Sequence, residues 1–395
     1  MSFPSISPFS FSLPTQISFG EGLSAQAGTH ISTLIPGRRA MIVTDPGIIQ
    51  AGLLEPVLTS LHQHNYQTEL FTQVAPNPKD TDCLLGAQLA RDYAPDVIVA
   101  VGGGSVIDSA KVIALLHTHP GTVQDYEGRD RVTGAVTPLV VIPTTAGTGS
   151  EVTRSAVITD TTRKFKMTVK DRKLAPRLAI VDPATTYSLP RSLTAATGMD
   201  AFVHAIEAFT CKVANPLSDA LAEAAMSRIW RALPTAVLQG ENKAARHEMM
   251  AGSLMAGIAF SHADVAAVHC MAEALGGLYD TPHGVANSIF LPVVTAFNAK
   301  ADPGKHARAA DLCGLSSPEQ SPEEAANRLV DALFRLSDQI GIPRFASLSY
   351  VKREDFPALA EASYQNGSTP NNCRTISAEE YLALFTDAFE GSRHP

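Results

Sequence analysis

Cysteine is scarce in this chain and is not arranged in pairs. Only five cysteines occur in 395 residues, no two of them form a CxxC pair, and their number is odd. A disulfide framework and a thiolate zinc site both need regularly spaced cysteines, so we expect neither. A chain without disulfides suits a reducing compartment, and we therefore expect a cytoplasmic protein.

Long apolar runs and an excess of basic residues are also missing. No stretch approaches the roughly 20 consecutive apolar residues that span a bilayer. The N-terminal segment MSFPSISPFSFSLP has neither a basic region nor a continuous apolar run, so we expect no secretory signal. Acidic residues outnumber basic ones by 39 to 31, which gives no long-range attraction to nucleic acid or anionic lipid. We expect a small molecule as the partner, and neither nucleic acid nor a membrane.

The length of the chain and its changing texture predict two domains. Short apolar, β-branched runs alternate with helix-like stretches in the first half, which is typical of parallel strands joined by crossover helices. The runs are AMIVTD (40–45), YQTELF (66–71), DVIVAV (96–101), PLVVIP (138–143) and LAIVDP (178–183). From Ser192 onward, Ala, Leu and Met recur with a helical period and convincing strands disappear. We predict an α/β domain over residues 1–190 and an all-helical domain over 191–395.

A glycine-rich turn follows the run DVIVAV and leads into the helical stretch SVIDSAKVIALL. Three consecutive glycines let the backbone approach a bound group closely, and the N-terminus of the helix attracts phosphate. Ser105 and Asp108 have the spacing of a helix-capping pair. Ile107 stands where GxGxxG has its third glycine, so a tight turn without a ligand is the alternative interpretation.

A second turn, PTTAGTGSEVT, follows the run PLVVIP and supplies several hydroxyl groups. In a parallel sheet it opens at the same carboxyl edge as the first turn, where ligands of doubly wound folds bind. Two such turns predict an extended, phosphate-containing cofactor. Asp45 ends the first strand, where a carboxylate can accept bonds from ribose hydroxyls and oppose a 2′-phosphate, which favours NAD over NADP. Asp45 could equally be a turn-forming residue before Pro46.

The segment TGMDAFVHAIEAF places Asp200 and His204 four residues apart on a predicted helix, so both side chains project from one face. An Asp–His hydrogen bond on a helix surface would give the same pattern. His269 lies on a second predicted helix that should end near Gly276 and Gly277, and His283 opens the next apolar segment. One carboxylate with three imidazoles suits Fe²⁺ or Zn²⁺ at a catalytic site.

Four segments, in this order and spacing, resemble the iron-containing (group III) alcohol dehydrogenase family: GGGSVIDSAK, PTTAGTGSE, DAFVHAIEA and VHCMAEALGGLYDTPHG. The resemblance covers nearly the whole chain. It implies an N-terminal Rossmann-like nucleotide-binding domain, a C-terminal all-helical metal-binding domain, an active site in the cleft between them and a homodimer or higher oligomer. It also implies a metal bound by four residues, namely Asp200, His204, His269 and His283. The predicted cofactor-binding residues are Asp45, Asn77, Gly102, Gly103, Gly104, Ser105, Asp108, Thr144, Thr145, Thr148 and Lys166.

One position departs from the family pattern. Many members carry a histidine four residues after the third metal ligand, where this chain has Glu273. We count Glu273 among the catalytic residues, as a proton relay whose pKa burial could raise. It could instead bind a polar group of the substrate or face solvent. His262, seven residues before His269, is interpreted as a packing or surface histidine.

The predicted function is the interconversion of a small alcohol and its aldehyde or ketone, by hydride transfer with NAD or NADP at a divalent metal. Fe²⁺ is expected, and Zn²⁺ would accept the same ligands. Two enzymatic alternatives are a polyol dehydrogenase resembling glycerol dehydrogenase and a lyase resembling dehydroquinate synthase. The lyase would need a basic pocket for a phosphorylated substrate, and the helical half has no cluster of Lys or Arg near the predicted ligands. A non-catalytic, metal-bearing oligomer is a third alternative.

Overall fold

The computed structural model describes residues 7–392, which form two compact units. One unit, here called the α/β unit, comprises residues 14–190 and 239–250. The other, here called the helical unit, comprises residues 7–13, 191–238 and 251–392. The five predicted strands and both glycine-rich turns fall in the α/β unit, and all four predicted metal ligands fall in the helical unit.

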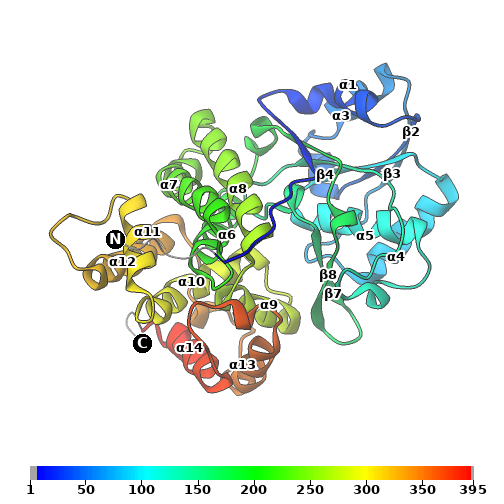
Figure 1. The fold of residues 1–395 in the computed structure, drawn as a ribbon. Coiled ribbons are helices and arrows are strands. Elements are labelled where there is room, and N and C mark those ends of the chain that lie inside the picture. Colours follow the sequence, from blue (N-terminus) through cyan, green and yellow to red (C-terminus); the bar gives the residue numbers. More distant parts are fainter. Residues whose placement is uncertain (1–6, 393–395) are drawn as a thin grey trace. The chain divides into compact units, whose positions relative to one another are not determined.

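The α/β unit is built on a parallel six-stranded sheet in the order β1-β9-β6-β4-β2-β3. A three-stranded sheet, β5-β8-β7, accompanies it. The strands are β1 (Gln16–Phe19), β2 (Arg39–Val43), β3 (Gln67–Phe71), β4 (Val97–Gly102), β5 (Gly128–Arg129), β6 (Leu139–Pro143), β7 (Ser155–Asp160), β8 (Phe165–Lys170) and β9 (Leu178–Val181). The helices are α1 (Ala27–Leu34), α2 (Pro46–Gln50), α3 (Glu55–Gln63), α4 (Asp80–Tyr93) and α5 (Gly104–Thr118). Figure 1 shows α1 and α3 on one face of the larger sheet and α4 and α5 on the other.

The strands form where the sequence predicts them; β2, β6 and β9 are almost wholly buried, whereas β3 at the edge of the sheet is buried only at Phe71. Every residue of β4 is buried, as expected for a strand covered on both faces. All five predicted runs lie in the parallel sheet, which confirms the predicted fold class. The strands β1, β5, β7 and β8 were not predicted. β1 has only exposed and partly exposed residues, and β7 alternates partly exposed with buried residues, so both lack the continuous apolar signal of the fully buried strands.

The helical unit is organised around α6 (Arg191–Thr210), which is buried along almost its whole length from Thr194 onward. A helix that is covered on all sides is expected at the centre of a bundle. Helices α7 and α10 pack against it. The other helices are α7 (Pro216–Leu238), α8 (Lys243–Ala263), α9 (Ala267–Tyr279), α10 (His283–Ala299), α11 (Pro303–Leu312), α12 (Pro322–Ile340), α13 (Phe356–Gln365) and α14 (Ala378–Glu390); the first part of α8, up to residue 250, belongs to the α/β unit.

Two local predictions were wrong. The helix that carries His269 runs two residues beyond the predicted end near Gly276 and Gly277, because α9 continues to Tyr279 and is followed by Asp280 in the left-handed conformation. Ser105 and Asp108 do not form a capping pair, because α5 begins at Gly104 and no described side chain caps its N-terminus. Among the described residues, no single helix is long and apolar enough to cross a membrane; only α8 and α9 taken together reach that length and composition, across a bend of 99°.

Candidate metal and cofactor sites

Four side chains converge in the helical unit and are called here the Asp–His₃ cluster: Asp200, His204, His269 and His283. One potential ligand atom from each lies within 4.8 Å of the others. Helix α6 supplies the first two residues, α9 the third, and the first turn of α10 the fourth. The structure therefore brings together all four ligands that the sequence nominates, from segments up to 83 positions apart. Fe²⁺ and Zn²⁺ bind such atoms at roughly 2.0–2.2 Å, so one ion can be shared by atoms this close together.

Three of the four residues of the Asp–His₃ cluster are buried, and the fourth, His283, is partly exposed. The side chain of Asp200 is 1% exposed, whereas that of His283 is 28% exposed. The ring of His204 stacks on Phe260 with the ring centroids 4.3 Å apart. Oδ2 of Asp200 is buried without a hydrogen-bond partner among residues 7–392. A buried carboxylate oxygen without a partner is costly, and a cation bound between the imidazoles would remove that cost.

Asn287 lies at the centre of the cluster and was not predicted from the sequence. Its Nδ2 lies 2.6 Å from Oδ1 of Asp200, 3.2 Å from Nε2 of His269 and 3.1 Å from Nε2 of His283. An amide nitrogen carries two hydrogens and cannot donate to three acceptors at once. The position of Asn287, four residues after His283 on the same face of α10, is the signal that could have identified it.

The ionisation of the cluster favours a charged aspartate. Burial raises the pKa of Asp200, but the three neighbouring imidazoles and the amide of Asn287 outweigh this effect and lower the pKa below 3.8. Burial lowers the pKa of His269, but the hydrogen bond and charge of Glu207 outweigh it and raise the pKa above 6.5. The site therefore offers an anionic oxygen beside three imidazoles, which is a donor set that fits a divalent transition-metal ion.

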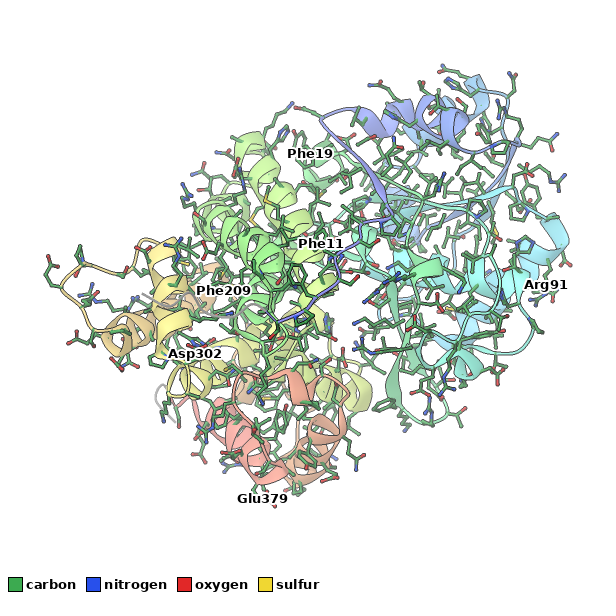
Figure 2. The ribbon with its side chains drawn as sticks, in the orientation of Figure 1. Phe11, Phe19, Arg91, Phe209, Asp302 and Glu379 are labelled. Atoms are coloured by element: carbon green, nitrogen blue, oxygen red, sulfur yellow. The ribbon has the colours of Figure 1, made fainter. Side chains whose placement is uncertain are left out.

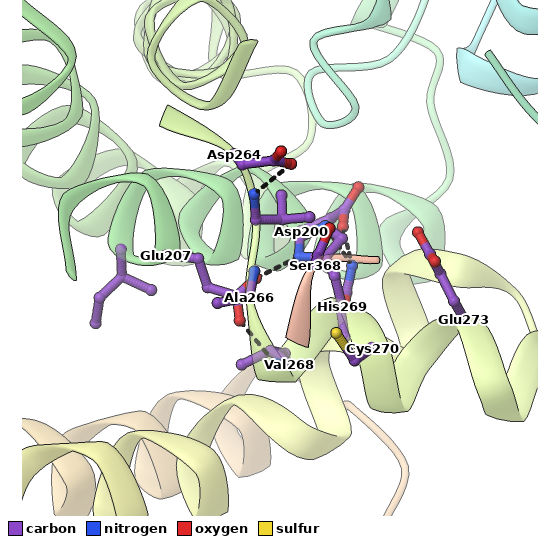
Figure 3. Close-up of polar contacts among 12 residues, drawn as sticks. Asp200, Glu207, Asp264, Ala266, Val268, His269, Cys270, Glu273 and Ser368 are labelled. Atoms are coloured by element: carbon purple, nitrogen blue, oxygen red, sulfur yellow. Dashed lines mark hydrogen bonds and ion pairs between the residues drawn. The ribbon is translucent and has the colours of Figure 1, made fainter. Parts of the chain in front are cut away.

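Glu207 is a second residue that the sequence analysis missed. Its carboxylate is buried and lies 2.6 Å from Nδ1 of His269. Figure 3 shows this carboxylate together with the backbone N–H groups of Ala266 and Val268, which donate to it. Glu207 follows Asp200 by seven residues on α6, so helical spacing alone could have placed it on the cluster's side of the helix.

Glu273 lies one turn beyond His269 on α9, as predicted, and is partly exposed (Figure 3). Its Oε2 accepts a hydrogen bond of 2.7 Å from Nδ2 of Asn366. Asn366 in turn accepts a hydrogen bond from the backbone N–H of Ser368. Glu273 is therefore held by the segment that follows α13, a partner that the sequence does not indicate.

His262 is a packing histidine, in agreement with the interpretation of the sequence. Its ring stacks on Phe11, labelled in Figure 2, with the centroids 3.8 Å apart. Its Nδ1 lies 2.8 Å from the carbonyl oxygen of Ile258, and its Nε2 lies 2.8 Å from that of Ser12. Both ring nitrogens are thus engaged away from the Asp–His₃ cluster.

The two glycine-rich turns lie against each other in the α/β unit. They follow β4 and β6, which are neighbours in the sheet. A β-carbon added at Gly103 would lie 3.2 Å from Cγ2 of Thr145, and one added at Gly104 would lie 2.6 Å from Cγ2 of Thr148. A methyl group at Gly104 would therefore force Thr148 to shift, and one at Gly103 would pack tightly against Thr145, so both glycines serve the packing between the turns in addition to any contact with a phosphate.

Several predicted cofactor residues have protein partners. Asp108 accepts hydrogen bonds from Oγ of Ser150 (2.5 Å) and from the backbone N–H of Val157 (2.9 Å). The buried Lys111, which was not predicted, donates to Ser150 Oγ at 2.7 Å and to Thr153 Oγ1 at 2.9 Å. These bonds tie α5 to the second turn and, through Val157, to β7. Asp108 thus has a structural role beside the predicted cofactor contact.

The other predicted cofactor residues include Asp45, Asn77, Thr144 and Lys166. Oδ1 of Asp45 accepts hydrogen bonds from the backbone N–H groups of Gly47 and Ile48 and so begins α2. This is the turn-forming role that the sequence left open. Asn77 and Lys166 are 89 positions apart, yet Nζ of Lys166 donates to Oδ1 of Asn77 at 3.0 Å. Thr144 is buried beside β4, where its N–H donates to the carbonyl oxygen of Gly102.

Comparison with known proteins covers both units. The family model "Iron-containing alcohol dehydrogenase" matches residues 14–183, and the model "Fe-containing alcohol dehydrogenase family, C-terminal" matches residues 194–389. The chain is 41% identical to the 1,3-propanediol dehydrogenase of Klebsiella pneumoniae over 383 residues, which are 96% of this chain and 99% of that protein. It is 38% identical to the NAD-dependent methanol dehydrogenase of Bacillus methanolicus, over 96% of this chain and 99% of that protein.

A solved structure of a 1,3-propanediol oxidoreductase superposes on the chain with a TM-score of 0.94 at 40% sequence identity. The match covers 97% of this chain and 100% of that one. Both the sequence likeness and the structural likeness thus extend over the two units and over every segment that carries the Asp–His₃ cluster and the glycine-rich turns. The chain therefore belongs to the iron-containing alcohol dehydrogenase family and is a nicotinamide-dependent oxidoreductase that interconverts small alcohols and carbonyl compounds.

Proposed function

We propose that the enzyme interconverts a short primary alcohol and its aldehyde, with NAD as the cofactor and one Fe²⁺ held by the Asp–His₃ cluster. The observation that carries the proposal is the convergence of one carboxylate and three imidazoles within 4.8 Å. Relatives named for 1,3-propanediol and methanol support a short primary alcohol as the substrate. Zn²⁺ would accept the same ligands.

The cluster would hold the ion through Asp200 Oδ and the ring nitrogens of the three histidines. A bound divalent ion supplies Lewis acidity, which lowers the pKa of an alcohol hydroxyl and polarises a carbonyl group. Asp200 contributes the negative charge, and its burial keeps that charge poorly solvated. Phe260 covers one side of His204 and keeps water from that ring. His283, the most exposed of the three histidines, marks the side from which a substrate can enter.

NAD would bind at the two glycine-rich turns of the α/β unit. The first-turn N–H groups of α5 have no side-chain cap among the described residues, and such groups attract the pyrophosphate. Thr145 and Thr148 offer hydroxyls beside Gly103 and Gly104, and Lys166 lies against Asn77. Asp45 would oppose a 2′-phosphate, which supports NAD over NADP.

Glu273 would recognise a polar group of the substrate. Its hydrogen bond to Asn366 fixes the carboxylate one turn beyond His269 while leaving the side chain partly exposed. A carboxylate oxygen accepts several hydrogen bonds, so Glu273 can accept one from a second hydroxyl of a diol in addition to that from Asn366. The cytoplasmic location stays a prediction from the unpaired cysteines, and the homodimer or higher oligomer stays one from the family resemblance.

The metal assignment is tested with Asp200→Asn, and His262→Gln serves as a control histidine in the same helical unit. Metal content of the purified proteins and NADH oxidation with a panel of short aldehydes are measured for both variants. Asp200→Asn should lose the metal, and its activity should fall more than about 100-fold. Loss of a metal ligand should have a larger effect than the roughly 10–100-fold effect of losing a residue that only hydrogen-bonds a ligand. His262→Gln should keep both. An Asp200→Asn enzyme that is active and replete with metal would refute the assignment.

A further inference from the structure

The buried carboxylate of Glu207 contacts a side chain and two backbone groups at once. Its Oε2 lies 2.6 Å from Nδ1 of His269 and accepts a hydrogen bond of 2.9 Å from the N–H of Ala266. Its Oε1 accepts a hydrogen bond of 2.7 Å from the N–H of Val268. The whole residue is 3% exposed, so water does not compete for these three donors (Figure 3).

The bond to His269 decides which ring nitrogen is available to the cluster. A carboxylate accepts hydrogen bonds, so Nδ1 of His269 carries the hydrogen that faces Glu207. Nε2 is then left with its lone pair, and Nε2 is the atom that faces Asn287 at the centre of the cluster. The negative charge of Glu207 also increases the basicity of the ring and hence its strength as a ligand.

The two backbone bonds decide where α9 begins. Ala266 and Val268 lie at the N-terminus of α9, where N–H groups have no partner within the helix. A carboxylate is stabilised there by the helix dipole. Glu207 therefore fixes the start of the helix that carries His269, and it does so from α6, the helix that carries Asp200 and His204.

We propose that Glu207 is a positioning residue of the metal site, which sets both the tautomer and the orientation of His269. It acts through His269 and does not contact the ion or the substrate. The inference rests on the proposed function in one respect only, namely that the Asp–His₃ cluster binds a divalent metal. Its alternative is that Glu207 is only a cap for α9, with no influence on the metal.

Glu207→Gln is the variant that separates the two roles. A glutamine has one acceptor oxygen and one donor amide, so it cannot accept from His269, Ala266 and Val268 together. The matched control is Glu324→Gln, which weakens the capping box of α12, where Oε2 of Glu324 accepts from the N–H of Ser321. Glu324 is also in the helical unit and is not part of the Asp–His₃ cluster.

The probe is Co²⁺ added to the metal-free full-length proteins, followed by its visible absorption and by calorimetric titration. Glu207→Gln should weaken Co²⁺ binding by about 10–100-fold and change the absorption bands, since one ligand is no longer held in place. Glu324→Gln should lower the unfolding temperature slightly and leave the affinity and the bands unchanged. Unchanged Co²⁺ binding and bands in Glu207→Gln would overturn the inference.

A second variant covers the case in which Glu207→Gln does not fold. Glu207→Asp keeps the charge but shortens the side chain, so its affinity for Co²⁺ should lie between those of the wild type and Glu207→Gln. If Glu207→Gln does not fold, Glu207→Asp is compared with the wild type alone and should bind Co²⁺ more weakly. Wild-type affinity in Glu207→Asp, with unaltered bands, would count against the inference. The proposed function would instead be refuted if the wild-type protein does not bind Co²⁺, or if Asp200→Asn binds Co²⁺ as tightly as the wild type does.

Discussion

The contact between the two glycine-rich turns predicts that Gly104→Ala destabilises the α/β unit through one identifiable clash. The added β-carbon would lie 2.6 Å from Cγ2 and 2.8 Å from Oγ1 of Thr148, whereas ordinary contacts begin at 3.4 Å. Overpacking of this kind costs about 1–3 kcal/mol. Alanine in place of glycine near a helix start returns about 0.5–1 kcal/mol, because the unfolded chain becomes less flexible. The net expected loss is about 1 kcal/mol, which lowers the unfolding temperature by about 2–4 °C for a unit of this size.

A double-mutant cycle with Thr148→Ala tests the cause of this loss. Alanine at 148 removes both atoms that the new methyl group would approach most closely, so the double variant should recover stability with a coupling of about 1 kcal/mol. Calorimetry and urea unfolding of the wild type, the two single variants and the double variant provide the four free energies. If Gly104→Ala unfolds at or above the wild-type temperature, or if the two changes add within about 0.3 kcal/mol, the packing argument is refuted.

Three further results are expected. Asp45→Gly should raise the ratio of kcat/KM with NADPH to kcat/KM with NADH. The fold should persist, because glycine in place of aspartate at a helix start costs only a few tenths of a kcal/mol. An unchanged ratio would show that Asp45 does not select NAD over NADP. Burial raises the pKa of Asp160, but hydrogen bonds from Arg163, Gln124 and Thr162 outweigh this effect and hold the pKa at about 2, below the ordinary value of 3.8. Asp160→Asn should therefore lower the free energy of unfolding by about 2 kcal/mol at pH 7. That difference should shrink by about half as the pH falls to 3, because the stabilisation by the ionised Asp160 is lost as the pH falls toward its lowered pKa in the folded protein. A difference in unfolding free energy that does not depend on pH would contradict the assignment. Glu273→Ala should raise KM for a short diol about tenfold, equal to about 1.4 kcal/mol, with little change for a monohydric alcohol; a shift of the pH–rate profile that is equal for both substrates would favour a proton relay instead.

The parts of the site that the sequence predicts are those that depend on local spacing. Asp200 and His204 occur four residues apart, so any helix brings them to one face, and α6 does so. The position of each glycine-rich turn is predicted from the apolar run that directly precedes it in the sequence. The bonds from Ser150 and Val157 to Asp108 could not be read in this way, because these donors lie 42 and 49 positions away.

Apolar periodicity and residue type are local properties, so the sequence alone predicts five strands of the parallel sheet, the helical character of the second half and the four candidate metal ligands. The residues that support these candidate ligands are distant in the sequence and meet them only in the folded chain. Glu207 meets His269 across 62 positions, and Asn366 meets Glu273 across 93. Such contacts depend on how whole helices pack, and packing is set by the sum of many weak apolar contacts that no short motif records.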